Sequence, residues 1–305
     1  MQLISPDIHI DFVGKQKFAL VLSLALILAG LVSLIIHKGP KYGVDFAGGT
    51  LVQAQFPEAV TAGDIRQSLS SLNLSDVSVQ VYGNDQNHEF LIRTSSSEVQ
   101  AGQLSQNISR AIAEKTGISP DIRRVEMVGP QVGDDLKKKA LLAIFYSLLF
   151  IAIYISGRFE LKWAVSGITG GALMAMVYFL SLFNVSIPFL IGAAILCSIV
   201  VFWFLRLQFA IGAIIALIHD VFITIGVFSI LNFDFSLTTI AALLTIIGYS
   251  LNDTIIIFDR IRENIKGETS NDKLPALFNK SINQTLSRTL LTSVTTLIVL
   301  FSLYF

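Results

Sequence analysis

Charged side chains are scarce in this 305-residue sequence. Lys, Arg, Asp and Glu together make up 14% of it, against roughly 25% in an average soluble domain. The 22 basic and 22 acidic residues cancel, so the chain has no positive field to attract phosphates, which excludes nucleic acid as a main partner. Cysteine is nearly absent as well. Cys197 is the only one, which excludes an internal disulfide and a cysteine-ligated metal site.

Long apolar runs are abundant instead. Hydrophobic residues make up 53% of the sequence, and its mean hydropathy is +0.67. Because a helix of about 18 or more apolar residues can cross a bilayer, the sequence predicts a polytopic α-helical membrane protein. About seven spans are expected, at 18–36, 140–156, 164–183, 185–205, 209–231, 236–258 and 286–305.

The positions of Lys and Arg in the short loops predict which side each loop faces. Basic residues precede the first span in "GKQK" and follow the second and sixth in "GRFELKW" and "DRIRENIK". We therefore expect the N-terminal segment 1–17 and a segment at 259–285 in the cytoplasm. Residues 1–17 are polar and partly acidic, unlike a cleaved signal peptide. Lys137–Lys139, just before the second span, would predict the opposite orientation. We expect them to be tolerated because a long domain precedes them, and long domains cross the membrane largely regardless of charge.

A polar region at 37–139 separates the first span from the transmembrane bundle at 140–305. Its apolar patterns predict the order strand, helix, strand, strand, helix, strand. That order is typical of an α+β ferredoxin-like (βαββαβ) domain, which the orientation places outside the cytoplasm. The predicted strands are "LVQAQF", "VSVQVY", "EFLIRT" and "DIRRVEMV", and the predicted helices are "TAGDIRQSLSSLN" and "EVQAGQLSQNISRAIAEKTG".

An ionisable residue, Asp220, lies near the middle of the span at 209–231, within "ALIHDVFITIGVF". Such a residue costs at least ~2.5–3.5 kcal/mol at the centre of a membrane helix, so it normally faces a bundle interior or water and often serves function. Asp220 is therefore the first candidate for proton handling. The alternative is a structural hydrogen bond to another helix. His219 points about 100° away on the helix, and we expect it to be a neutral, hydrogen-bonded, supporting histidine.

The sixth span carries a second polar group, within "GYSLNDTIIIFDRIREN". Asn252 and Asp253 are candidate proton-handling residues there, and Tyr249 is a supporting one. Small residues such as Ser250 let helices approach closely. We therefore expect this helix to turn a polar seam toward Asp220.

Charged residues crowd the predicted cytoplasmic end of this helix, about 9 Å from Asp253 along the axis. Asp259, Arg260, Arg262 and Glu263 can form ion pairs at i,i+3 spacing. Arg260 is the best candidate to point inward and pair with an acid, and Asp259 and Arg262 are supporting residues. The alternative, a solvated basic anchor, stays open.

The stretch "GVDFAGGT" at 43–50 combines Asp45 with paired glycines. Its spacing does not match a phosphate-binding loop, and a tight turn that sets how the domain meets the membrane is the simpler interpretation. The sequence also shows no nucleophile–base arrangement, no HExxH motif and no Cys/His metal cluster. An enzyme is therefore not expected.

Taken together, six motifs resemble the SecF proteins of the SecD/SecF family, which belongs to the RND superfamily. They occur in the family's order and cover most of the chain except about 160–207. The motifs are "YGVDFAGGT", "VGPQVGDDL", "RFELKWA", "GAIIALIHDVFIT", "IIGYSLNDTIIIFDRIREN" and "SINQTLSRTLLTS".

The resemblance implies an RND-like bundle in the bacterial cell inner membrane, with a cytoplasmic N-terminus and a periplasmic domain. It implies a partner, SecD, and a SecDF complex beside the SecYEG channel and SecA, with YajC and YidC as further candidates. Such a complex draws unfolded polypeptides across the membrane with the proton gradient. On this basis Asp220, Asn252, Asp253 and Arg260 lie in the proton-handling region, and no cofactor other than protons as the coupling ion is expected.

The sequence departs from the family pattern in two places. In the family pattern, "RFE" leads almost directly into the helix that contains "GAIIALIHDV". Here both "GRFELKWAVSG" and "LRLQFAIGA" resemble that junction, and the residues between them predict an extra helical hairpin at about 160–207. In addition, the family pattern continues for one more span after "LIVLFSLYF". Two alternatives to the export function stay open: a proton-coupled RND-type exporter of small molecules or lipids, and a non-conducting assembly subunit.

Overall fold

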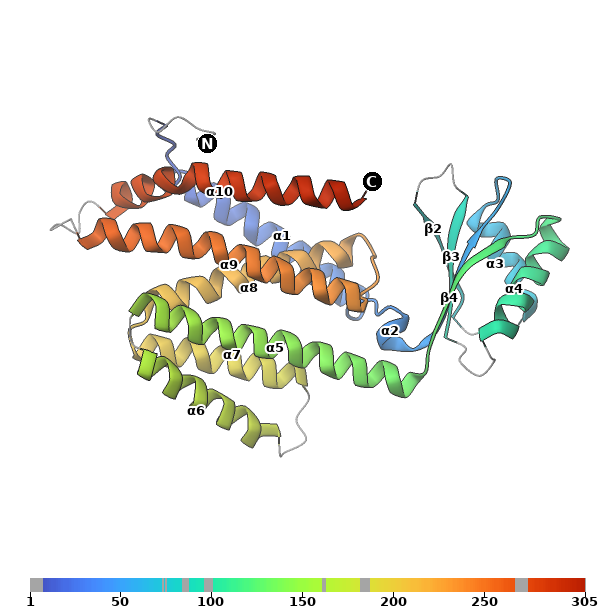
Figure 1. Cartoon of the computed structure of the whole chain (residues 1–305), viewed down its shortest axis with the longest axis horizontal. Coiled ribbons are helices and arrows are strands. Elements are labelled where there is room, and N and C mark those ends of the chain that lie inside the picture. Colours follow the sequence, from blue (N-terminus) through green and yellow to red (C-terminus); the bar gives the residue numbers. More distant parts are fainter. Residues whose placement is uncertain are drawn as a thin grey trace. The chain divides into compact units, whose positions relative to one another are not determined.

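The computed structural model describes residues 8–72, 74, 76–83, 88–95, 101–160, 163–181, 187–266 and 274–304. The chain divides into two compact units. The first, called the helical unit below, comprises residues 1–39, 144–232 and 241–305, and the second, called the sheet unit, comprises 40–143 and 233–240. Figure 1 shows the long helices of the helical unit and the small sheet of the sheet unit.

The long helices agree in place with the predicted apolar runs. Among the described residues, five are long and apolar enough to cross a membrane: α1, α5, α8, α9 and α10. In the described part of the predicted hairpin region, Ile195–Phe204 within α7 is a shorter apolar helix. The bounds are α1 Gln16–Ile36, α5 Pro130–Glu160, α6 Trp163–Ser181, α7 Ile187–Phe204, α8 Gln208–Ile230, α9 Leu237–Lys266 and α10 Leu274–Tyr304.

Three of these helices extend well past the apolar runs. α5 begins at Pro130 rather than near 140, α9 continues to Lys266, and α10 begins at Leu274 rather than near 286. Proline suits the first position of a helix because the missing N–H has no partner there in any case. Apolar runs mark the hydrophobic part of a helix and do not include the polar turns by which these helices continue.

Glycine and serine make the contact between α1 and α8. A Cβ atom added to Gly30 would lie 2.6 Å from the Cα atom of Gly226, so only glycine fits at this crossing. One turn further on, the hydroxyls of Ser33 and Ser229 lie 2.8 Å apart and are buried. Small residues permit such close helix packing in membranes, where van der Waals contact and interhelical hydrogen bonds replace the hydrophobic effect. The crossing holds α8, which carries Asp220.

Two asparagines of α10 bind the backbone just before α1. The side chain of Asn283 accepts a hydrogen bond from the Ile10 N–H and donates one to the Ile10 carbonyl, both at 2.9 Å. The Asn279 oxygen accepts from the N–H groups of Phe12 and Val13, also at 2.9 Å. These amides satisfy backbone groups that would otherwise need water, and they attach the start of the described chain to its last helix.

The sheet unit contains a four-stranded antiparallel sheet in the order β2-β3-β1-β4, with α3 and α4 on one face (Figure 1). The elements follow one another as strand, helix, strand, strand, helix, strand. The core lies between helices and sheet and includes Val52, Ile65, Ile92 and Ile108, each fully buried. The bounds are α2 Val44–Ala47, β1 Gly49–Gln55, α3 Ala62–Leu69, the 3-10 turn η1 Ser70–Leu72, β2 Ser78–Tyr82, β3 Glu89–Thr94, α4 Ala101–Thr116 and β4 Asp121–Val128.

The paired glycines form the turn between α2 and β1. Gly48 and Gly49 have φ angles of 72° and 114°, a region that residues with a Cβ atom rarely adopt. A Cβ atom on Gly49 would lie 2.3 Å from the Thr94 carbonyl oxygen, and one on Gly48 would lie 3.0 Å from the Cα atom of Pro130. The turn therefore lets β1 pass close to the end of β3 and the start of α5. The short helix α2, which contains Asp45, was not predicted.

Candidate functional site

Asp220 of α8 binds a side chain from α9. The Ser250 hydroxyl donates a hydrogen bond to its Oδ2 atom at 2.5 Å, and the Asp220 side chain is 38% exposed within the isolated chain. The sequence predicted that the α9 seam would face Asp220, and Ser250 is the residue through which it does so. The contact gives the Asp220 carboxylate a hydrogen-bond donor from the neighbouring helix.

His219 is the second partner of the Asp220 carboxylate. Its Nδ1 atom lies 2.8 Å from Asp220 Oδ1, although neighbouring residues on a helix start about 100° apart. The imidazole therefore reaches back along the helix surface, and the hydrogen bond expected of this histidine is made to its neighbour, Asp220. Because an ionised carboxylate only accepts hydrogen bonds, the contact needs a proton on Nδ1 or on the carboxyl group. The donor of this hydrogen bond is therefore either the imidazole N–H or the carboxyl O–H.

Asp253 lies one turn beyond Ser250 and faces α10. Its Oδ1 atom accepts a hydrogen bond from the Thr292 hydroxyl at 3.3 Å. Both Ser250 and Asp253 line a groove of about 620 Å³ between the two helices, the α9–α10 groove. The other polar residues that line it are Thr245 and Tyr249 of α9 and Thr292, Ser293 and Thr296 of α10, and the remainder are apolar.

The α10 side of this groove was missed by the sequence analysis. Thr292, Ser293 and Thr296 lie in the apolar stretch "LLTSVTTLIVL". Hydroxyl residues three and four apart fall on one face of a helix, and that spacing was the available signal. At about 30 Å³ per water molecule, the groove has room for several waters beside Asp253.

The remaining predicted site residues are not brought to Asp220. Asn252 is exposed on α9, and Arg262 is half-buried. Arg260 pairs with Glu263 one turn away, at 2.9 Å, so the acid that it meets lies on its own helix. Asp259 pairs with Arg158 of α5 at 3.0 Å, which joins the ends of two long helices.

Three features define the class to which this protein belongs, the polytopic membrane proteins with intramembrane acids. They are the long apolar helices, the small α+β unit that lies in the sequence between the first and second of them, and the hydrogen-bonded carboxylate between two helices. The sequence comparisons identify the family. Residues 33–56 match the SecD/SecF GG motif, and residues 108–196 and 180–305 match the C-terminal region of the protein export membrane proteins SecD/SecF. The chain belongs to the SecD/SecF family.

Relatives match nearly the whole chain. The protein translocase subunit SecF of Calditerrivibrio nitroreducens is 39% identical over 99% of this chain and 84% of its own length. The SecF subunit of Desulfurispirillum indicum is 36% identical over 97% of this chain and 81% of its own length. The crystal structure of SecDF, a translocon-associated membrane protein from Thermus thermophilus, superimposes with a TM-score of 0.71 at 28% identity. The superposition covers 97% of this chain and 33% of the SecDF chain.

Proposed function

We propose that this protein is an auxiliary subunit of the Sec protein translocase that works with SecD and uses the proton gradient to promote polypeptide export. The observation that carries the proposal is the match to SecF subunits over almost the entire chain. The similarity to a SecDF structure supports SecD as the partner. The same matches disfavour an exporter of small molecules or lipids.

Several finer features belong to the proposal. The protein lies in the bacterial inner membrane, with seven spans if α6 and α7 cross as well. Its N-terminus is cytoplasmic, and the sheet unit, whose strand order agrees with a ferredoxin-like fold, is periplasmic and meets the emerging unfolded polypeptide. SecYEG and SecA are the further partners, with YajC and YidC as additional ones. Protons serve as the coupling ion.

The proton route begins at Asp220 and its two partners. When Asp220 releases a proton, the Ser250 hydroxyl and the His219 imidazole stabilise the ionised carboxylate by donating to it. Ser250 also lines the α9–α10 groove, in which Asp253 is the only carboxylate among the described lining residues. Water in that groove would link the Ser250 hydroxyl to Asp253. The route therefore needs two acids on different helices, joined through one serine.

The test is a reconstituted SecDF–SecYEG system in which ATP-driven and gradient-stimulated translocation are measured separately. Asp220→Asn keeps the size of the side chain but cannot titrate, so gradient stimulation should be lost while ATP-driven translocation persists. Asp121→Asn, an exposed residue of β4, is the matched control. Unchanged stimulation in Asp220→Asn would refute the proton role. A reduced yield of the complex with SecD, with stimulation per complex retained, would favour the assembly alternative.

A further inference from the structure

The turn between α7 and α8 has no role in the proposed function. It comprises residues 205–207 and closes the segment that was predicted as an extra hairpin. A pocket of about 430 Å³ opens beside it and is lined by Trp203, Arg206, Gln208 and Ile211. This volume is within the usual range of small-ligand sites, about 300–1,000 Å³. The pocket is therefore large enough to hold a small polar group.

Two backbone hydrogen bonds shape this turn. The Arg206 N–H donates to the Trp203 carbonyl at 3.1 Å, and the Leu207 N–H donates to the Phe202 carbonyl at 2.9 Å. This is the pattern of a Schellman motif, which ends a helix with one residue in a left-handed conformation. The side chains of Phe202 and Leu207 are buried in one cluster, and apolar burial of this kind commonly accompanies the motif. The left-handed position falls to Arg206.

Arg206 thus occupies a backbone position that favours glycine. Its φ angle is 55°, a region in which a Cβ atom is unfavourable. Residues other than glycine that are held in such conformations gather at functional sites. Glycine or asparagine would form the same turn with less strain, so the turn itself does not account for an arginine here.

The three polar side chains that line the pocket all offer N–H donors. Within the described part of the chain, the Arg206 guanidinium, the Trp203 indole and the Gln208 amide make no hydrogen bond or ion pair. The described lining residues also include no acid. The guanidinium presents its donors as a planar fork that fits two oxygens of a phosphate group. The pocket is therefore suited to an anion that carries phosphate oxygens.

The pocket lies at the level of the lipid headgroups. α8 is long and apolar enough to cross a membrane and begins at Gln208, so its first turn lies near one surface of the bilayer. Trp203 and Phe204, at the end of α7, are 73% and 80% exposed. Tryptophan is enriched at the membrane–water interface, where its ring contacts lipid and its N–H reaches polar groups. The exposed aromatic side chains therefore adjoin lipid.

The cation of this turn is also available to an external partner. The cluster that contains Phe202 includes Ile155 and so joins the end of α7 to the end of α5 (Figure 1). At that end of α5, Arg158 pairs with Asp259 of α9 at 3.0 Å. Arg206, by contrast, meets no acid among the described residues. Its charge is thus left for a group outside the chain.

We propose that the pocket at the α7–α8 turn binds the headgroup of an anionic phospholipid of the surrounding bilayer. Arg206 pairs with the phosphate, the Trp203 indole and the Gln208 amide donate to headgroup oxygens, and Ile211 forms an apolar wall. A zwitterionic lipid is disfavoured because the described lining residues offer no acid to its ammonium group. A free phosphate has the same oxygens, but the exposed Phe204 beside the pocket favours a ligand with acyl chains. The proposal goes beyond the proposed function and does not depend on it.

Fluorescence quenching by brominated lipids measures this binding in the full chain. The sequence has two tryptophans, so Trp163→Phe leaves Trp203 as the only one. This variant is reconstituted in vesicles of phosphatidylcholine and phosphatidylglycerol, with either lipid brominated in turn. Trp203 should prefer phosphatidylglycerol about fivefold, which is the attraction that one basic residue near an anionic surface provides. Added salt should weaken the preference, because it screens the charges.

Substitutions of Arg206 in this single-tryptophan variant test the pairing. Arg206→Gly should abolish the preference and keep the turn, because glycine adopts the left-handed conformation without strain. Arg206→Asn is a second uncharged variant that tolerates this conformation, and it is measured should the first fail to insert. Arg206→Lys keeps the charge without the planar fork and should retain part of the preference. Lys17→Gln, at an exposed cation of the first turn of α1, is the matched control and should retain all of it.

Several results would overturn the lipid site. The first is equal quenching by both brominated lipids in the Trp163→Phe protein, and the second is a preference that survives loss of the Arg206 charge. An equal loss in Lys17→Gln would indicate a general basic field, and displacement by excess inorganic phosphate would assign the pocket to a free anion. None of these results depends on translocation, so the lipid site and the proton role of Asp220 can fail separately.

Discussion

The hydroxyl of Ser250 donates to the Asp220 carboxylate across 2.5 Å and joins α9 to α8 at the candidate site. Ser250 is also part of the α9–α10 groove, which contains Asp253. One small side chain thus binds Asp220 and also lines the groove that contains Asp253. Whether the hydroxyl of Ser250 is required can be tested directly.

Ser250→Ala should reduce gradient-stimulated translocation about tenfold, because a hydrogen bond to a charged group contributes roughly 1.5–3 kcal/mol. ATP-driven translocation should be unaffected. Ser250→Thr, which keeps the hydroxyl, should recover most of the stimulation. Both variants are measured in the same reconstituted system as the wild type. A Thr variant as defective as the Ala variant would indicate that the site requires small volume and not the hydroxyl.

The crossing of α1 and α8 gives a prediction about stability. A Cβ atom on Gly226 would lie 2.9 Å from Gly30 Cα, so Gly226→Val forces the helices apart and should destabilise the protein by about 1–3 kcal/mol. Gly248→Ala is the control, since a Cβ atom there meets no atom within 4 Å. Thermal unfolding of both variants in the same detergent measures the difference. Equal midpoints would mean that the crossing is not tightly packed in the membrane.

Local patterns predicted the elements but not the contacts between distant ones. The strand "DIRRVEMV" has the predicted bounds, Asp121–Val128, because its ends are marked by Pro120 and Gly129. Asp220 was identified because a carboxyl group in an apolar span is costly, and the approach of α9 to it was expected from small residues such as Ser250. By contrast, α5 begins earlier than predicted because hydropathy does not detect polar helical turns.

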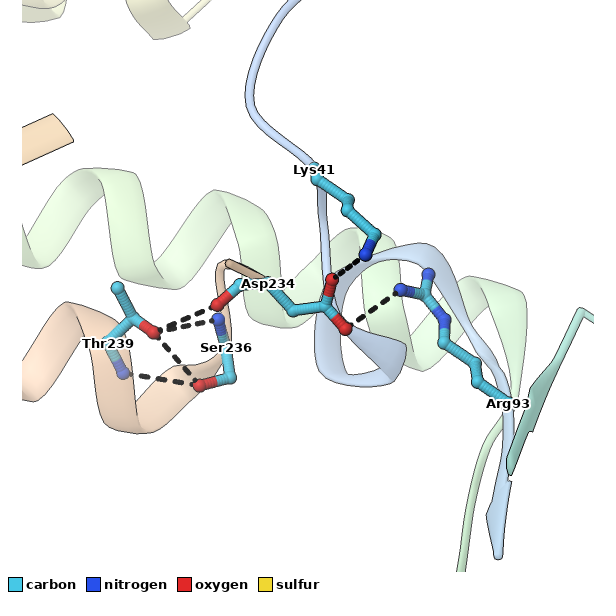
Figure 2. A network of polar contacts seen from close by, with 5 residues as sticks. All are labelled: Lys41, Arg93, Asp234, Ser236 and Thr239. Carbon is cyan, nitrogen blue, oxygen red and sulfur yellow. Dashed lines mark hydrogen bonds and ion pairs between the residues drawn. The ribbon is translucent and has the colours of Figure 1, made fainter. Parts of the chain in front are cut away.

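Contacts that join residues remote in sequence left no local signal. Asn283 and Ile10 are 273 residues apart, and an asparagine in "SINQTLSR" has no feature that identifies its partner. The pairing of Asp234 with Lys41 and Arg93, which Figure 2 shows, is of the same kind. The loop "NFDFS" has no local feature that identifies the partners of its acid, Asp234.

The asparagines of α10 should protect the residues before α1 from proteolysis. Asn283→Ala removes both hydrogen bonds to Ile10. Each contributes about 1 kcal/mol, so trypsin cleavage after Lys15 should become roughly thirtyfold faster when it occurs from a locally opened state. Asn283→Asp keeps the acceptor for the Ile10 N–H and should show a smaller increase. Mass spectrometry of the early digest measures both rates, and the exposed Gln284→Ala is a control that should cleave like the wild type.

The capping box of α3 predicts how the stability of this helix depends on pH. The Thr61 hydroxyl donates to Asp64 Oδ2 and the Thr61 N–H donates to the same carboxyl oxygen. Both hydrogen bonds favour the ionised form and lower the pKa of Asp64 from its ordinary value of 3.8, the side-chain bond having the larger effect. Because the pKa of Asp64 is lower in the folded state than in the unfolded state, ionised Asp64 stabilises the fold. This contribution is complete above pH 3.8 and is lost as the pH falls through the pKa of the folded state, which lies below 3.8.

Asp64→Asn should therefore remove this part of the acid sensitivity. In wild type, the amides of α3 should lose protection as the pH decreases below about 4, after correction for the intrinsic exchange rate. In Asp64→Asn, protection should be lower near neutral pH and nearly independent of pH in the acid range. Thr61→Val removes the stronger hydrogen bond but leaves the carboxyl group, so its transition should shift up toward pH 3.8. Hydrogen exchange of residues 62–69 in the full chain measures all three, and an identical acid transition in wild type and Asp64→Asn would contradict the assignment.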